Sequence, residues 1–158
     1  MRVWVDADAC PGPVKEILFR AADRVRVHVT LVANQPIATP RSPFVHFRQV
    51  ERGDDMADRR IAEALAAGDM VVTADMPLAA EAVRRGALAL SPRGERYDAG
   101  NVAQALAMRD FMTGLRAAGV DTGGPAPFRA ADTRAFAREL DRLLQTVPPA
   151  GARRPADG

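Results

Sequence analysis

The chain has 158 residues, of which 47% are hydrophobic and 27% charged, and its formal net charge is +2; this balance is typical of one globular domain with its own core. No apolar run approaches the ~20 residues that cross a bilayer, and Asp6 and Asp8 interrupt the first apolar segment, so we expect neither a membrane span nor a signal peptide. The single cysteine, Cys10, excludes an internal disulfide and favours a reducing cytoplasmic location.

Short apolar runs alternate with amphipathic runs over the first 91 residues. In chain order the patterns predict a strand at 2–5, a helix opened by Pro11 and Pro13, strands at 25–32 and 44–50, a helix at 54–67 ended by Gly68, a strand at 70–73, a helix at 77–85 and a strand at 87–90. The segment 34–43 contains three prolines and is expected to be a loop. This alternation predicts an α/β fold with a mostly parallel five-stranded sheet and helices on both faces.

The pattern changes in the last third of the chain. Two longer helices are expected at 99–118 and 131–146, separated by the turn-rich segment 119–125. We expect these helices to pack on the sheet as part of a single domain, residues 1–147. Residues 148–158, rich in Pro, Gly and Ala, are expected to be a disordered tail.

Carboxylates follow two of the predicted strands directly. Asp6 and Asp8 follow the first strand, and Asp75 follows the fourth, with Thr73 two residues earlier on the same side of the pleat. The carboxyl ends of parallel strands meet at one edge, where open α/β sheets bind ligands. Aspartates gathered there repel one another unless a cation lies between them, and Mg²⁺ or Mn²⁺ is the expected ion.

The helix at 54–67 adds two more candidates. Asp58 shares a face with Ile61 and Leu65, so it is expected to point inward, where a carboxylate is costly unless it is paired or bound to metal. Asp54 is interpreted as a helix cap, and for Asp55 a capping role and a supporting role stay open. The predicted metal ligands are Asp6, Asp8, Asp58 and Asp75.

The expected chemistry is hydrolysis of a phosphodiester by metal-bound water. Asp6, Asp58 and Asp75 are the predicted catalytic residues, and Asp55 and Thr73 support them. Every basic residue except Lys15 is an arginine, whose planar group suits phosphate, although a GC-rich genome would produce the same excess. We expect Arg93, Arg96 and Arg116 to bind nucleic acid; the alternative is that they are simply solvated.

Other functions remain open on the residues alone. A phosphatase of the haloacid dehalogenase type also begins with strand-Asp-x-Asp, but Lys15 lies in the first helix, where it cannot serve that chemistry. Cys10 near a helix N-terminus is a weaker candidate nucleophile, since neither His28 nor His46 has an evident path to it. Asp69 is interpreted as a turn residue after Gly68 rather than a ligand.

A non-catalytic alternative is a metal-dependent RNA- or nucleotide-binding module. In that case arginines outside the acidic edge would carry the phosphate contacts: Arg41, Arg109 and Arg116. The sequence leaves open whether the chain forms a homo-oligomer.

Several motifs along the chain occur together in one known family. They are Asp6-Ala7-Asp8-Ala9-Cys10-Pro11, Val32-Ala33-Asn34, Asp55-x-x-Asp58, Gly68-Asp69-x-Val71-Val72-Thr73-x-Asp75-x-Pro77-Leu78-Ala79, Arg93-Gly94, Leu115-Arg116-x-x-Gly119 and Thr122-Gly123-Gly124-Pro125. Over residues 2 to about 146 the chain resembles the bacterial YaiI/YqxD family, which is grouped with PIN-like domains. The resemblance implies a metal-dependent ribonuclease site acting on single-stranded RNA, with acidic roles on Asp6, Asp58 and Asp75 and support from Asp8 or Asp55.

Overall fold

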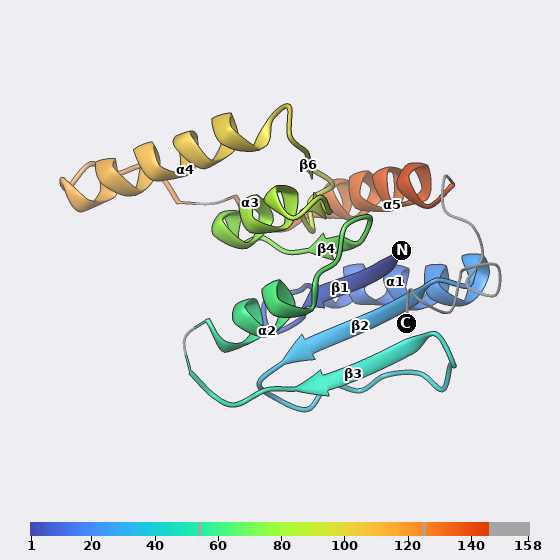
Figure 1. The fold of residues 1–158 in the computed structure, drawn as a ribbon. Coiled ribbons are helices and arrows are strands. Elements are labelled where there is room, and N and C mark those ends of the chain that lie inside the picture. The colour runs from blue at the N-terminus through green and yellow to red at the C-terminus, as the bar shows by residue number, and fades with distance from the viewer. Residues whose placement is uncertain (54, 125, 146–158) are drawn as a thin grey trace.

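A computed structural model describes residues 1–53, 55–124 and 126–145. Its centre is a six-stranded sheet in the order β3-β2-β1-β4-β5-β6 (Figure 1). The strands are β1 (Arg2–Asp6), β2 (His28–Ala33), β3 (Val45–Gln49), β4 (Met70–Val72), β5 (Leu88–Leu90) and β6 (Arg96–Tyr97). The first five pair in parallel and β6 pairs with β5 in antiparallel fashion, so the predicted mostly parallel α/β sheet is confirmed, with one short edge strand more than expected.

Helices cover both faces of this sheet. They are α1 (Gly12–Val25), α2 (Met56–Ala64), α3 (Met76–Arg84), α4 (Val102–Ala117) and α5 (Ala130–Leu144). Side chains of β1 alternate between two cores, because successive strand residues point to opposite faces. Val3 and Val5 join the core beneath α1 and α5, whereas Trp4 joins the core beneath α2 and α3.

Most element boundaries lie within a few residues of the expectation, and two of the differences have a clear structural cause. The second strand begins at His28 rather than at residue 25, because α1 continues to Val25 and ends at Arg26, whose φ is 57°. The second helix ends at Ala64 rather than at Gly68, because Leu65 is extended and the Ala66 N–H bonds to Asp69 Oδ2 at 3.0 Å. A buried acceptor outside the helix therefore ends it earlier than the glycine signal indicated.

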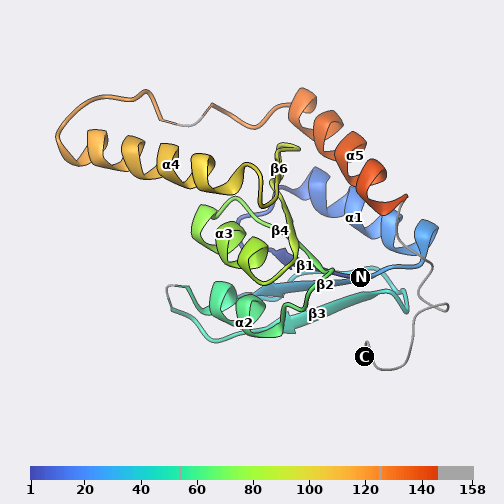
Figure 2. The same ribbon diagram turned by 45° about the horizontal axis from the view of Figure 1, so that its top comes forward.

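The two C-terminal helices behave differently, although both were expected to pack on the sheet. In α5, Phe136 and Leu140 are completely buried against the core of α1. In contrast, α4 runs out from the body beside α3 (Figures 1 and 2) and buries none of its side chains. The expectation is therefore correct for α5 and wrong for α4.

Two remaining expectations concern the chain ends and the membrane. The tail expected at 148–158 and the helix cap expected at residue 54 both lie outside the described residues. Within the described part of the chain, no helix is both long enough and apolar enough to cross a bilayer.

Candidate metal centre

The candidate site is built where β1 and β4 end next to each other. The strands pair in register from Val3 with Met70 to Val5 with Val72, which brings Asp6 beside Thr73. The buried Thr73 hydroxyl donates to Asp6 Oδ2 at 3.0 Å and accepts the Asp75 N–H at 3.0 Å. Thr73 therefore fixes the two predicted catalytic aspartates relative to each other.

Asp75 has a structural role as well. It is the N-cap of α3, and its Oδ1 accepts the Leu78 N–H at 2.9 Å, which satisfies one of the free amides at the helix start. This bond holds the half-buried side chain in one orientation at the edge of the sheet.

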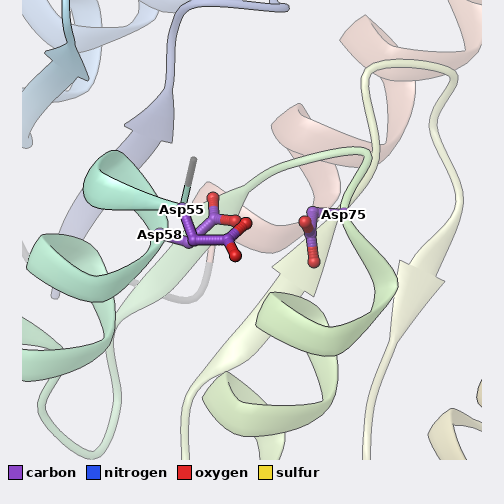
Figure 3. Close-up of side chains that lie close together, drawn as sticks. All are labelled: Asp55, Asp58 and Asp75. Carbon is purple, nitrogen blue, oxygen red and sulfur yellow. The ribbon is translucent and has the colours of Figure 1, made fainter. Parts of the chain in front are cut away.

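The start of α2 supplies the facing carboxylates. Asp58 lies in its first turn, half-buried and on the inward side that Ile61 also occupies. Asp55 precedes the helix in a left-handed conformation with φ of 65°. Figure 3 shows both side chains directed toward Asp75, and one carboxylate oxygen of each of the three lies within 4.8 Å of the others.

The electrostatics of the cluster are unfavourable without a cation. Burial, and then the negative charges of Asp6 and Asp75, raise the pKa of Asp58 to about 7. Burial also raises the pKa of Asp6, helped by the charges of Asp75 and Asp8 and opposed by the Thr73 hydrogen bond. Across the described residues, none of the ion pairs involves these carboxylates. A group of hard oxygen ligands with unrelieved repulsion fits Mg²⁺ or Mn²⁺.

The predicted ligands are not all placed alike. Asp55, Asp58 and Asp75 form the compact group, whereas Asp6 adjoins it closely enough that its charge raises the pKa of Asp58. Asp8 is exposed, and both of its oxygens accept the Asn34 N–H at 3.1 and 3.0 Å. Asp8 therefore ties the β1 end to the β2 end, and it acts on the cluster through its charge on Asp6.

Two arginines that the sequence did not assign to the nuclease site lie next to the aspartates. Arg59 of α2 and Arg109 of α4 line the same open hollow of about 440 Å³ as Asp55, Asp58 and Asp75. Arg59 immediately follows Asp58, a signal that sequence analysis could have used. Arg109 was considered only for the binding module, because its approach depends on how α4 lies against α3.

The three predicted nucleic-acid-binding arginines all have partners. Arg93 pairs with Asp132 at 2.9 Å. Arg96 lies 3.3 Å from Asp98, and Arg116 donates to the Thr122 hydroxyl at 3.3 Å. All three are at least partly exposed, so their role in binding nucleic acid stays a prediction.

The structure resolves two other sequence alternatives. Cys10 is buried, and burial raises the pKa of its thiol to about 12, which disfavours the thiolate that a cysteine nucleophile requires. The two histidines considered as partners of Cys10, His28 and His46, bond to each other at 2.9 Å.

Asp69 has a structural role and is not one of the clustered carboxylates, in agreement with its interpretation as a turn residue. It is buried and accepts the Ala66 N–H.

Comparisons with known proteins agree with the motifs. A family model described as the uncharacterised bacterial YaiI/YqxD family matches residues 4–146. A UPF0178 protein of Halorhodospira halophila is 57% identical over 158 residues, 100% of each chain. Another, of Shewanella amazonensis, is 55% identical over 94% of this chain and 99% of its own. No solved structure matches the chain. The family match over residues 4–146 and these identities show that the chain belongs to the YaiI/YqxD family.

Proposed function

We propose that the protein is a Mg²⁺- or Mn²⁺-dependent nuclease of PIN-like type that hydrolyses phosphodiesters in single-stranded RNA. The observation that carries this proposal is the cluster of Asp55, Asp58 and Asp75, whose oxygens lie within 4.8 Å of one another at the carboxyl edge of the sheet. Asp6 adjoins the cluster and extends the acidic surface.

Each residue has a distinct task in this proposal. Asp55, Asp58 and Asp75 would hold the ion, which supplies a water of lowered pKa and stabilises charge on the phosphate. Asp6, bonded to Thr73, orients the cluster from the β1 side. Because the pKa of Asp58 is about 7 without a cation, its carboxyl group gives up a proton when the ion binds.

Two arginines that line the hollow would contact the substrate in this proposal. Arg59 and Arg109 line the hollow beside the aspartates. Their guanidinium groups can hold phosphate oxygens of the strand, since a polyanion would otherwise be repelled by the acidic cluster. The presence of aspartates and arginines in the same hollow favours a nucleic-acid substrate over a small neutral one.

The test is cleavage of mixed-sequence single-stranded RNA with Mg²⁺ or Mn²⁺ by the wild type and by Asp75→Asn. Asparagine is also a good N-cap and can still accept the Leu78 N–H, so α3 should persist while a charged ligand is lost. We expect the rate to fall at least about 100-fold. The matched control is Asp121→Asn, at an exposed loop residue, which should retain wild-type rates.

The other functions are outcomes of the same experiment. Thermal stabilisation by the ions with no cleavage of any RNA or DNA would contradict the nuclease and support the metal-dependent binding module. Release of phosphate from small phosphomonoesters, with no cleavage of RNA, would support the phosphatase instead.

A further inference from the structure

A second cavity lies on the other side of the chain segment that carries Asp75. Residues 75, 77 and 78 line the acidic hollow, whereas residues 73, 74 and 76 line this cavity of about 410 Å³, which is inside the ~300–1,000 Å³ range of small-molecule pockets. We call it the hairpin cavity; its wall includes Thr73, Met76, Arg93, Glu95, Tyr97 and Phe128. The buried Thr73 contributes to its wall and also bonds to Asp6, so the cavity and the acidic cluster share a residue.

The walls combine aromatic rings with a carboxylate. Tyr97 comes from β6 and Phe128 from the segment before α5, and both are half-buried. The Arg93 guanidinium lies 5.6 Å from the centre of the Phe128 ring, and its bond to Asp132 holds it there. Flat apolar surfaces of this kind are what stacked nucleobases use, whatever the base.

Glu95 is an exposed carboxylate on the cavity wall. Its Oε1 accepts the Ser91 hydroxyl at 3.3 Å. Burial, then the charge of Glu95 and its hydrogen bond, raise the pKa of Tyr97, which places the phenol beside the same carboxylate. A carboxylate offers about four acceptor positions, so it keeps acceptor capacity for a ligand N–H.

The turn that presents Glu95 is preformed. The Ser91 hydroxyl accepts the Arg93 and Glu95 N–H groups at 3.2 and 3.1 Å. Gly94 has φ of +88°, and a Cβ there would come within 2.6 Å of the Ala135 backbone. The turn is therefore packed directly onto α5, and Glu95 is held by backbone bonds rather than by a loose loop.

We propose that the hairpin cavity is a nucleobase subsite, in which one base of the bound strand stacks on Tyr97 and donates its Watson–Crick-edge N–H groups to Glu95. This inference rests on the proposed function, in which the bound strand is RNA and its phosphate lies at the acidic cluster. Guanine presents two adjacent N–H donors to one carboxylate, whereas uracil presents one N–H flanked by carbonyl oxygens that repel it. The subsite therefore favours guanine over uracil.

The test is a binding measurement without metal, so that cleavage cannot interfere. Fluorescence anisotropy in chelator compares a 5′-labelled hexamer of alternating uridine and guanosine with labelled hexauridylate. We expect the guanosine-containing strand to bind about tenfold more tightly to the wild type. Glu95→Gln should remove this preference, and Glu16→Gln, an exposed glutamate on α1, should keep it.

Variants of Tyr97 separate stacking from hydrogen bonding. Tyr97→Ala should weaken binding of both strands at least about tenfold, while Tyr97→Phe keeps the ring and should bind both strands nearly as the wild type does. Thermal melting of each variant confirms folding, and the Glu95→Gln arm stands alone if Tyr97→Ala does not fold.

The outcomes distinguish this inference from the proposed function. Equal affinity of the wild type for the two strands, or a guanosine preference that Glu95→Gln retains, overturns the subsite even if the protein cleaves RNA. A preference that depends on Glu95 supports the subsite even if no cleavage is seen with either ion, a result that would remove only the nuclease proposal.

Discussion

The two ends of β4 each carry aspartate, and the two environments are opposite. Asp69, before the strand, is only 5% exposed and accepts hydrogen bonds from the Arg2 N–H, the Trp4 Nε1–H and the Ala66 N–H at 3.0–3.2 Å. Asp75, after the strand, faces Asp55 and Asp58 instead (Figure 3). Asp69 is surrounded by donors, whereas Asp75 accepts one N–H from its own helix and otherwise faces other carboxylates.

The surroundings of each carboxylate distinguish a structural role, at Asp69, from a candidate ligand-binding role, in the acidic cluster. N–H donors compensate the lost hydration of Asp69, so the fold accommodates this buried side chain and depends on its hydrogen bonds. At the other end, burial and neighbouring charges raise the pKa of Asp58 to about 7, so the cluster opposes its own ionisation. A proton or a cation is what relieves that repulsion.

The largest expected effect is on stability at the donor-rich end. Asp69→Asn replaces one acceptor oxygen by an amide that faces N–H donors, so we expect the free energy of unfolding to fall by about 3 kcal/mol. Urea denaturation measures it. A loss below about 0.5 kcal/mol would contradict the structural role assigned to Asp69.

A substitution in the acidic cluster, beyond the other end of β4, should reduce activity without unfolding the protein. Asp58→Asn removes a predicted ion ligand, and we expect metal-dependent RNA cleavage to fall about 100-fold while the protein stays folded. Folded Asp69→Asn is the control and should keep its rate. Equal rates for Asp58→Asn and the wild type would exclude Asp58 from the site.

Cation binding should stabilise the wild type selectively. At ten times the dissociation constant, Mg²⁺ or Mn²⁺ should add about 1.4 kcal/mol to the free energy of unfolding. Denaturation with and without the ion, at constant ionic strength, measures this. Asp58→Asn should show little of the gain; the same gain in the variant would indicate that the ion binds elsewhere.

The metal-free protein should also show a pH dependence of its stability. Burial and neighbouring carboxylates raise the pKa of Asp58 from 3.8 to about 7, so between these values the folded chain keeps a proton that the unfolded chain has lost. The free energy of unfolding should therefore fall as the pH rises from about 4 to 7 and then level off.

Because other groups also titrate, the difference between wild type and Asp58→Asn isolates this contribution. The variant should become more stable relative to the wild type as the pH rises across the same interval, as urea denaturation in chelator would show. A difference that does not change with pH would contradict the raised pKa of Asp58.

The sequence predicted the parts of the site that depend on local pattern. Asp6 and Asp75 follow apolar strands, and parallel strands carry such residues to one edge whatever the details of packing. Asp58 shares its helical face with Ile61, so its inward direction follows from the 3.6-residue period. The strand–helix alternation predicted the layered fold for the same reason.

The remaining features depend on contacts between distant residues, which local pattern does not encode. The hydrogen bond from Ala66 to Asp69 ends α2 before Gly68, and the Asn34 N–H engages Asp8. Only the tertiary structure placed Arg109 in one hollow with the aspartates, and Tyr97 and Phe128 around one cavity, because these residues come from elements whose separation in the chain does not predict how they pack. The sequence by itself determined the sheet and its acidic edge; the tertiary structure decided which carboxylates come within reach of one another there.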